Sequence, residues 1–278
     1  MDPRTYLRNL ATAVALTWQL IDRRRHDADA FTLVKLVHKA EGSRTYRIDL
    51  EAETALHEAV RAHLGNQIVC TGEEFPVSRT ALERSEFFAA CDALDGSTLL
   101  SLGFNHWAVA LAIVANGSDP GIYAAAVADS TGRVVCANRA LPGVYDGAGE
   151  PLTVNLSRQR SLQGATLSLS GATPRKYAAM QKRLGVRFND LGLVIPFAGS
   201  PGILKVLSGQ VDCATSTSRG YDFAAAAFLA EQAGAYVRGM DGGSLPYREA
   251  LLDPGIKHPW IVAGNEELGE DLRAALGG

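Results

Sequence analysis

The chain has 278 residues, 47% of them hydrophobic, and a formal net charge of −3 at pH 7. A chain of this length and composition buries one substantial core or two abutting smaller cores, which excludes an intrinsically disordered protein. Because both signs of charge are spread along the sequence without a basic stripe, we expect a small-molecule ligand, and neither a nucleic acid polymer nor a membrane surface as partner.

The N-terminal part of the chain has helical periodicity. Apolar residues from Leu10 to Ile21 are interrupted by polar ones, and no small-residue cleavage site follows them. The spacing predicts an amphipathic helix over 6–24 and a second helix over 49–63. A run of about 18 uninterrupted apolar residues, the approximate length of a membrane span, occurs nowhere, so we expect a cytoplasmic protein.

The rest of the chain alternates between short apolar runs and helical patterns. Strands are predicted at 67–71, 87–94, 107–115, 121–128, 165–169, 193–195 and 260–263. Further helices are predicted at 174–184, 203–207, 223–234 and the C-terminus. A glycine-rich segment at 143–151 is the best candidate for a boundary, and it divides the chain into an α+β subdomain over 1–145 and an α/β subdomain over 146–278.

The four cysteines lie far apart, without the close pairs typical of zinc sites or disulfide frameworks. We interpret all four as reduced, mostly buried thiols. Cys91 directly precedes an acidic motif, so a position beside a metal stays open for it.

The most informative segment is Asp92 to Thr98, with the sequence DALDGST. Its two aspartates, separated by a tight turn, can reach one hard cation, and magnesium prefers such oxygen ligands. If a helix begins at the glycine, its first N–H groups form a local anion site beside the cation. A capped surface turn would explain the motif equally well when it is taken alone.

Other acidic residues stand where predicted strands and helices end or begin. Glu73 and Glu74 follow a strand, Asp49 heads a helix, and Asp222 precedes an apolar helix. Their mutual repulsion would be costly without a counter-ion, so a cation cluster is the favoured interpretation.

In combination and order these motifs resemble the inositol monophosphatase and fructose-1,6-bisphosphatase superfamily of lithium-sensitive, magnesium-dependent phosphatases. The family pattern is Gly-Glu-Glu, then Asp-Pro-(Ile or Leu)-Asp-Gly-(Ser or Thr), then Trp-Asp at the start of a late helix of small residues. Here these elements are Gly72 to Glu74, Asp92 to Ser97, and Tyr221-Asp222. Ala93 replaces the proline and Tyr221 replaces the tryptophan, and neither change removes a metal ligand.

The resemblance, which extends from Asp49 to about Gly234, implies a layered α/β/α/β/α sandwich that binds two or three Mg²⁺ ions and forms a homodimer. It implies carboxylate ligands at four positions and a backbone carbonyl ligand at a fifth, with Glu74 a less certain ligand. The five implied ligands are Glu73, Asp92, Leu94, Asp95 and Asp222.

The resemblance also implies hydrolysis of a phosphate monoester by a metal-activated water. Ser97 would hydrogen-bond that water, and Asp49 or Glu73 would accept its proton. The turn from Gly96 through Ser97 to Thr98 would hold the phosphate oxygens. As alternatives, Asp49 and Ser97 each serve only to cap a helix.

Substrate contacts are expected from Ala198, Gly199 and Thr215. Thr215 stands where inositol phosphatases have an acidic residue, so inositol phosphates, sugar phosphates and nucleotide 3′-phosphates all remain open as substrates. A relative that binds a phosphorylated metabolite without hydrolysing it is the alternative function. A glycosidase is disfavoured because the two acids lie so near each other in the sequence.

Overall fold

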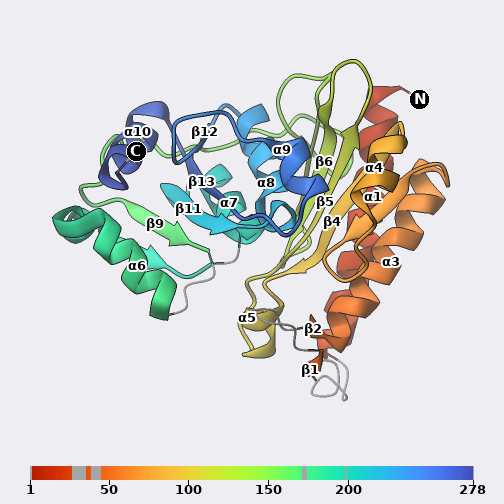
Figure 1. Cartoon of the computed structure of the whole chain (residues 1–278), viewed down its shortest axis with the longest axis horizontal. Helices are drawn as coiled ribbons and strands as arrows, with labels where there is room; N and C mark the ends of the chain where they lie inside the picture. Colours follow the sequence, from red (N-terminus) through yellow and green to blue (C-terminus); the bar gives the residue numbers. More distant parts are fainter. Residues whose placement is uncertain (1, 27–35, 39–44, 171–173, 198, 278) are drawn as a thin grey trace.

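The computed structural model describes residues 2–26, 36–38, 45–170, 174–197 and 199–277. Two sheets and the helices around them form alternating layers (Figure 1). The shorter elements are β1 (Leu36–His38), β2 (Thr45–Tyr46), α4 (Arg79–Arg84), α5 (Ser97–Ser101), the 3-10 helix η1 (Gly185–Asp190) and α9 (Tyr247–Leu252). Within this described part, no helix is long and apolar enough to cross a membrane.

The first sheet has six strands in the spatial order β3-β4-β5-β6-β7-β8. Strands β3 and β4 run parallel, and every other neighbouring pair is antiparallel. The strands are Val69–Gly72 (β3), Phe87–Asp95 (β4), Ala108–Ala115 (β5), Gly121–Asp129 (β6), Val134–Asn138 (β7) and Tyr145–Asp146 (β8). The last two strands lie outside the runs predicted from the sequence.

Two long helices, α1 and α3, cover the outer face of this sheet. They span Pro3–His26 and Arg47–Leu64. Every second residue of β5 points toward them, so Val109, Leu111 and Ile113 share a buried cluster with Leu10 of α1 and Leu56 of α3. The alternation along β5 thus determines which residues meet the helices.

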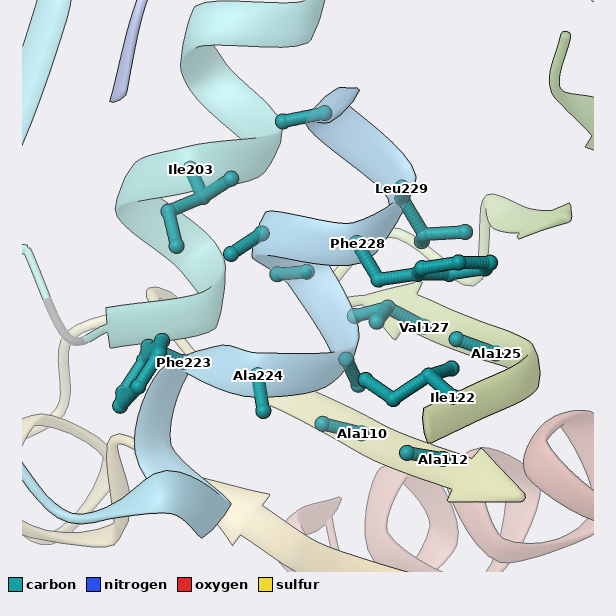
Figure 2. Packing of buried hydrophobic residues seen from close by; sticks show 14 of the residues in the cluster. Ala110, Ala112, Ile122, Ala125, Val127, Ile203, Phe223, Ala224, Phe228 and Leu229 are labelled. Atoms are coloured by element: carbon teal, nitrogen blue, oxygen red, sulfur yellow. The ribbon is translucent and has the colours of Figure 1, made fainter. Parts of the chain in front are cut away.

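The opposite face of the first sheet packs against helices α7 (Gly199–Leu207) and α8 (Gly220–Gln232). Figure 2 shows Ala224 and Phe228 of α8 over the small side chains Ala110, Ala112 and Ala125. Small residues on both surfaces allow the helix and the sheet to approach closely. This packing explains why β5 is buried along its whole length.

The second sheet has five strands in the order β10-β9-β11-β13-β12. Strands β10, β9 and β11 are parallel, and β13 is antiparallel to both of its neighbours. The strands are Thr166–Leu169 (β9), Leu193–Ile195 (β10), Cys213–Ser218 (β11), Tyr236–Gly239 (β12) and His258–Ala263 (β13).

Helices α6 (Pro174–Leu184) and α10 (Glu266–Ala275) cover the outer face of the second sheet. Met180, Leu268 and Leu272 pack there against the strands. The five layers confirm the predicted α/β/α/β/α sandwich. One buried cluster joins residues of both sheets through α7 and α8, and the division into subdomains at 145/146 stays a prediction.

Candidate active site

Three carboxylates from separate parts of the chain come together at the end of the first sheet. One oxygen from each of Glu73, Asp92 and Asp222 lies within 4.8 Å of the other two. Because β3 and β4 are parallel with Gly72 beside Cys91, the residues that follow these two positions lie at the same sheet edge. Asp222 comes from the first turn of α8, so the cluster joins both halves of the chain.

Asp95 lies next to this cluster because of an irregularity in β4. The register against β5 shifts between Asp92 and Asp95, as in a β-bulge. The Oδ2 atom of Asp95 accepts a hydrogen bond from the Ser200 N–H at 2.5 Å. Burial and the charge of Asp222 raise the pKa of Asp95 to about 8. Asp95 is therefore fixed at the start of α7 and is electrostatically part of the cluster.

The electrostatics of the cluster favour a bound cation. Burial, followed by the charges of Asp95, Glu73 and Asp222, raises the pKa of Asp92 well above its ordinary value. Burial also raises the pKa of Asp222 to about 6. Carboxylates that repel one another in this way are of the type that hard divalent cations bind.

A small pocket of about 30 Å³ lies among these groups and offers room for about two water-sized particles. Its lining includes Asp92, Leu94 and Glu73, and also Asp49 and Ser97. The residues present therefore fit a magnesium site by their chemistry, their closeness and the available space. The ligand roles of Glu73, Asp92, Leu94, Asp95 and Asp222 remain a prediction that this geometry supports.

Asp49 and Ser97 lie near each other at one side of the pocket. Asp49 accepts the Tyr46 N–H at 2.7 Å, so it does cap its helix, and the nearby Ser97 hydroxyl favours its ionised form. Burial raises the pKa of Asp49 to about 7. Capping and a proton-accepting role are therefore compatible in this residue. No capping hydrogen bond is formed by Ser97, because the N-cap of α5 is Gly96, whose φ of 101° is left-handed.

The structure brings one basic residue into the cluster that the sequence interpretation missed. The Arg219 guanidinium donates to Glu73, and its Nη2 atom lies 3.8 Å from Oδ1 of Asp222. Lys176 also acts electrostatically on Asp222. Two positive charges offset only part of the charge of this group of four acids. The position of Arg219 three residues before Asp222 was the signal available in the sequence.

The turn that carries Glu73 is held by a buried carboxylate on α3. Glu53 is 1% exposed and accepts the N–H groups of Glu74 at 2.9 Å and Phe75 at 2.8 Å. A Cβ on Gly72 would come within 2.3 Å of Oε1 of Glu53, so only glycine fits there without a shift. We infer that Glu53 positions the turn. Glu53 lies four residues after Asp49 on the same face of the helix, but this spacing alone did not identify its role.

Glu53→Gln is expected to weaken Mg²⁺ binding by about 10-fold, because an amide cannot accept both N–H groups and the turn loses one anchor. Isothermal titration calorimetry of the metal-free protein measures this change. Glu51→Gln is the matched control, since Glu51 lies on the same helix and pairs with Arg24 and Arg47. Equal Mg²⁺ affinity in both variants would refute the positioning role.

Of the three residues predicted to contact the substrate, the two that the structure describes show no feature that supports this role. Ala198 lies outside the described residues. Gly199 is buried, and a Cβ there would come within 2.0 Å of the Asp222 carbonyl oxygen, so close packing alone requires glycine. Thr215 is fully buried, and its hydroxyl donates to the Trp260 carbonyl at 2.6 Å. Substrate contacts by these residues remain predictions. The Thr215 hydroxyl already donates to the Trp260 carbonyl, which argues against a substrate contact by Thr215.

Comparisons with known proteins identify the family and the fold of this chain. The model of the inositol monophosphatase family matches residues 6–273. The chain is 24% identical over 243 residues to the chloroplastic phosphatase IMPL1 of Arabidopsis thaliana, and the match covers 81% of this chain and 62% of that protein. This chain thus spans less than two thirds of the length of that curated relative.

Solved structures share the fold. The extragenic suppressor protein SuhB of Bartonella henselae has a TM-score of 0.78 and 18% identity over 96% of both chains. An IMPase of Thermotoga maritima has a TM-score of 0.74 and 14% identity, with 96% of this chain and 94% of that chain covered. SuhB of Mycobacterium tuberculosis has a TM-score of 0.70 and 19% identity over 100% and 98% of the two chains.

Fold and site together define a layered α/β protein with a cluster of acidic residues, from both sheets' surroundings, that could hold a metal ion. The chain belongs to the inositol monophosphatase family. The resemblance predicted from the motifs is confirmed.

Proposed function

We propose that this protein is a magnesium-dependent phosphatase that hydrolyses a phosphate monoester of a small metabolite. The observation that carries the proposal is the meeting of Glu73, Asp92 and Asp222 beside the Asp49–Ser97 pair. Membership of the family and the phosphatase among its relatives support the same reaction class.

Asp49 and Ser97 would move the proton of the attacking water. The Ser97 hydroxyl lies near Asp49 and would donate to it, which would leave the Ser97 oxygen free to accept a hydrogen bond from that water. As the water oxygen bonds to phosphorus, the bond from phosphorus to the leaving oxygen would break. The water proton would pass to Ser97 and the Ser97 proton to Asp49, while the leaving alkoxide oxygen takes a proton from solvent and becomes the alcohol. A carboxyl with a pKa of about 7 is suited to this exchange near neutral pH.

Glu73, Asp92, the Leu94 carbonyl, Asp95 and Asp222 would hold two or three Mg²⁺ ions. Magnesium bound there would supply positive charge to the phosphate and to the leaving oxygen. The turn from Gly96 to Thr98 would direct its N–H groups at the phosphate oxygens. Lithium inhibition and a homodimer belong to this proposal because the family resemblance implies them, and a cytoplasmic location belongs to it as the expectation from the sequence.

The test is phosphate release from inositol, sugar and nucleotide 3′-monophosphates, with Mg²⁺, with EDTA and with added Li⁺. The variant Asp95→Asn removes one proposed ligand, and Asp119→Asn is its control because Asp119 is an exposed residue paired with Arg139. We expect Mg²⁺-dependent release that EDTA, Li⁺ and Asp95→Asn suppress and Asp119→Asn does not. Tight, Mg²⁺-dependent binding of a monophosphate without release would instead favour the non-catalytic alternative.

A further inference from the structure

A second group of metal-ligating side chains lies behind the proposed magnesium pocket. It consists of Glu53 and His57 on α3 and Cys91 on β4, with exposed fractions of 1%, 7% and 2%. One ligand atom of each lies within 4.8 Å of the other two. This trio, the Glu53–His57–Cys91 cluster, shares no residue with the proposed magnesium ligands.

The spacing of the three ligand atoms is close to that of a tetrahedral metal site. The Cys91 Sγ atom lies 3.5 Å from Nε2 of His57, and that nitrogen lies 3.8 Å from Oε1 of Glu53. The Thr71 carbonyl oxygen lies 3.5 Å from the same sulfur and adds a fourth donor. Zinc bonds of about 2.3 Å to sulfur and about 2.0 Å to nitrogen or oxygen put neighbouring ligand atoms about 3.3–3.6 Å apart.

The donor set selects a transition metal over magnesium. A thiolate and an imidazole are ligands of zinc and related ions, whereas magnesium takes oxygen. Each carboxylate oxygen of Glu53 accepts one backbone N–H and keeps a second lone pair free. Burial lowers the pKa of His57 to about 4, so its imidazole is neutral, the form that binds metal.

The position of the cluster provides a route for an ion. Glu53 lines the pocket that also contains Glu73 and Asp92, so an ion can enter from the proposed magnesium site. Among the described residues, the other three cysteines belong to no group of three close metal-ligating side chains. Cys91 is distinguished from them by its two partners on α3.

We propose that the Glu53–His57–Cys91 cluster binds one Zn²⁺ or similar transition-metal ion, separately from the magnesium ions of the active site. Binding replaces the thiol proton of Cys91 and also the carboxyl proton of Glu53 where that is present, because burial raises the pKa of Glu53 to about 7. These protons pass to solvent, no bond other than S–H and O–H is broken, and no electron is transferred.

Cobalt tests the site directly, because a cobalt thiolate absorbs in the near ultraviolet and magnesium does not compete for sulfur. The reduced protein is titrated with Co²⁺ and then Zn²⁺ in saturating Mg²⁺. The wild type should give the thiolate band at one Co²⁺ per chain, and Zn²⁺ should remove it. Cys91→Ser should abolish the band and weaken Zn²⁺ binding by at least about 100-fold, since a direct ligand is lost.

Two controls separate this site from its surroundings. Cys70→Ser alters another buried thiol, on the neighbouring strand, and should keep the band. Asp222→Asn alters the proposed magnesium site and should keep it too, so the two sites succeed or fail independently.

X-ray absorption of the wild type tests the site even if the Cys91→Ser variant does not fold. Zinc-edge X-ray absorption of the wild type should show one sulfur at about 2.3 Å and nitrogen and oxygen at about 2.0–2.1 Å. A shell of oxygen alone, the absence of a thiolate band, or a band that survives in Cys91→Ser would each overturn the proposal.

Discussion

Asp92→Asn is expected to lower Mg²⁺-dependent phosphate release by about 10³-fold while raising the free energy of unfolding of the metal-free protein. The two effects have one cause. Asp92 is buried among Asp95, Glu73 and Asp222, and their charges oppose its ionisation. Removing its charge relieves this repulsion and at the same time removes a proposed ligand.

Asparagine suits the test because it retains the local geometry. The Oδ1 atom of Asp92 accepts the Leu94 N–H at 3.0 Å, and the amide oxygen of asparagine can accept the same bond. Urea unfolding in EDTA measures the stability, and phosphate release measures the activity. Asp119→Asn, which removes an exposed carboxylate, should change neither. An active Asp92→Asn variant, or one destabilised in EDTA, would count against the proposed site.

The fold was predictable from local pattern where the pattern was strong. Alternating or continuous apolar runs marked the central strands β4, β5 and β6, and helical spacing marked α1 and α3. Strands β1, β2, β7, β8, β11 and β12 were not predicted. Helix α7 was predicted to start at Ile203, but it starts at Gly199. Near this start the Ser200 N–H donates to Asp95, a contact between distant parts of the chain that the local sequence does not reveal.

The acidic cluster was predictable because its members stand at the ends of strands and helices. The sequence did not reveal the residues that support it. Glu53 contacts a turn about twenty positions away, Arg219 reaches across to Glu73, and the Tyr221 hydroxyl lies 3.2 Å from the Thr71 hydroxyl. Each of these contacts joins a motif residue to a residue far away in the sequence, so it depends on tertiary packing that the motifs alone do not reveal.

The stability of the metal-free protein is expected to fall by several kcal/mol as the pH rises from about 6.5 to about 8. Burial raises the pKa of Asp49 and Glu53 to about 7 and of Asp95 to about 8, far above the value of an unfolded carboxyl. In this range the folded state therefore binds more protons than the unfolded state. Because folding is linked to proton binding, the free energy of unfolding is highest at low pH and falls as the pH rises through the folded-state pKa values.

His57 does not reverse this trend in the chosen range, because its lowered pKa of about 4 affects stability only below the unfolded value of about 6.5. Urea unfolding in EDTA at several pH values measures the slope, and Asp95→Asn should flatten it by removing the group with the highest of the three values. Mg²⁺ should flatten it as well, since the ion binds the ionised carboxylates and stabilises the folded state more as the pH rises. Stability that rises with pH in EDTA, or a slope that Mg²⁺ leaves unchanged, would show that these carboxylates are not the buried, cation-binding group inferred from the structure.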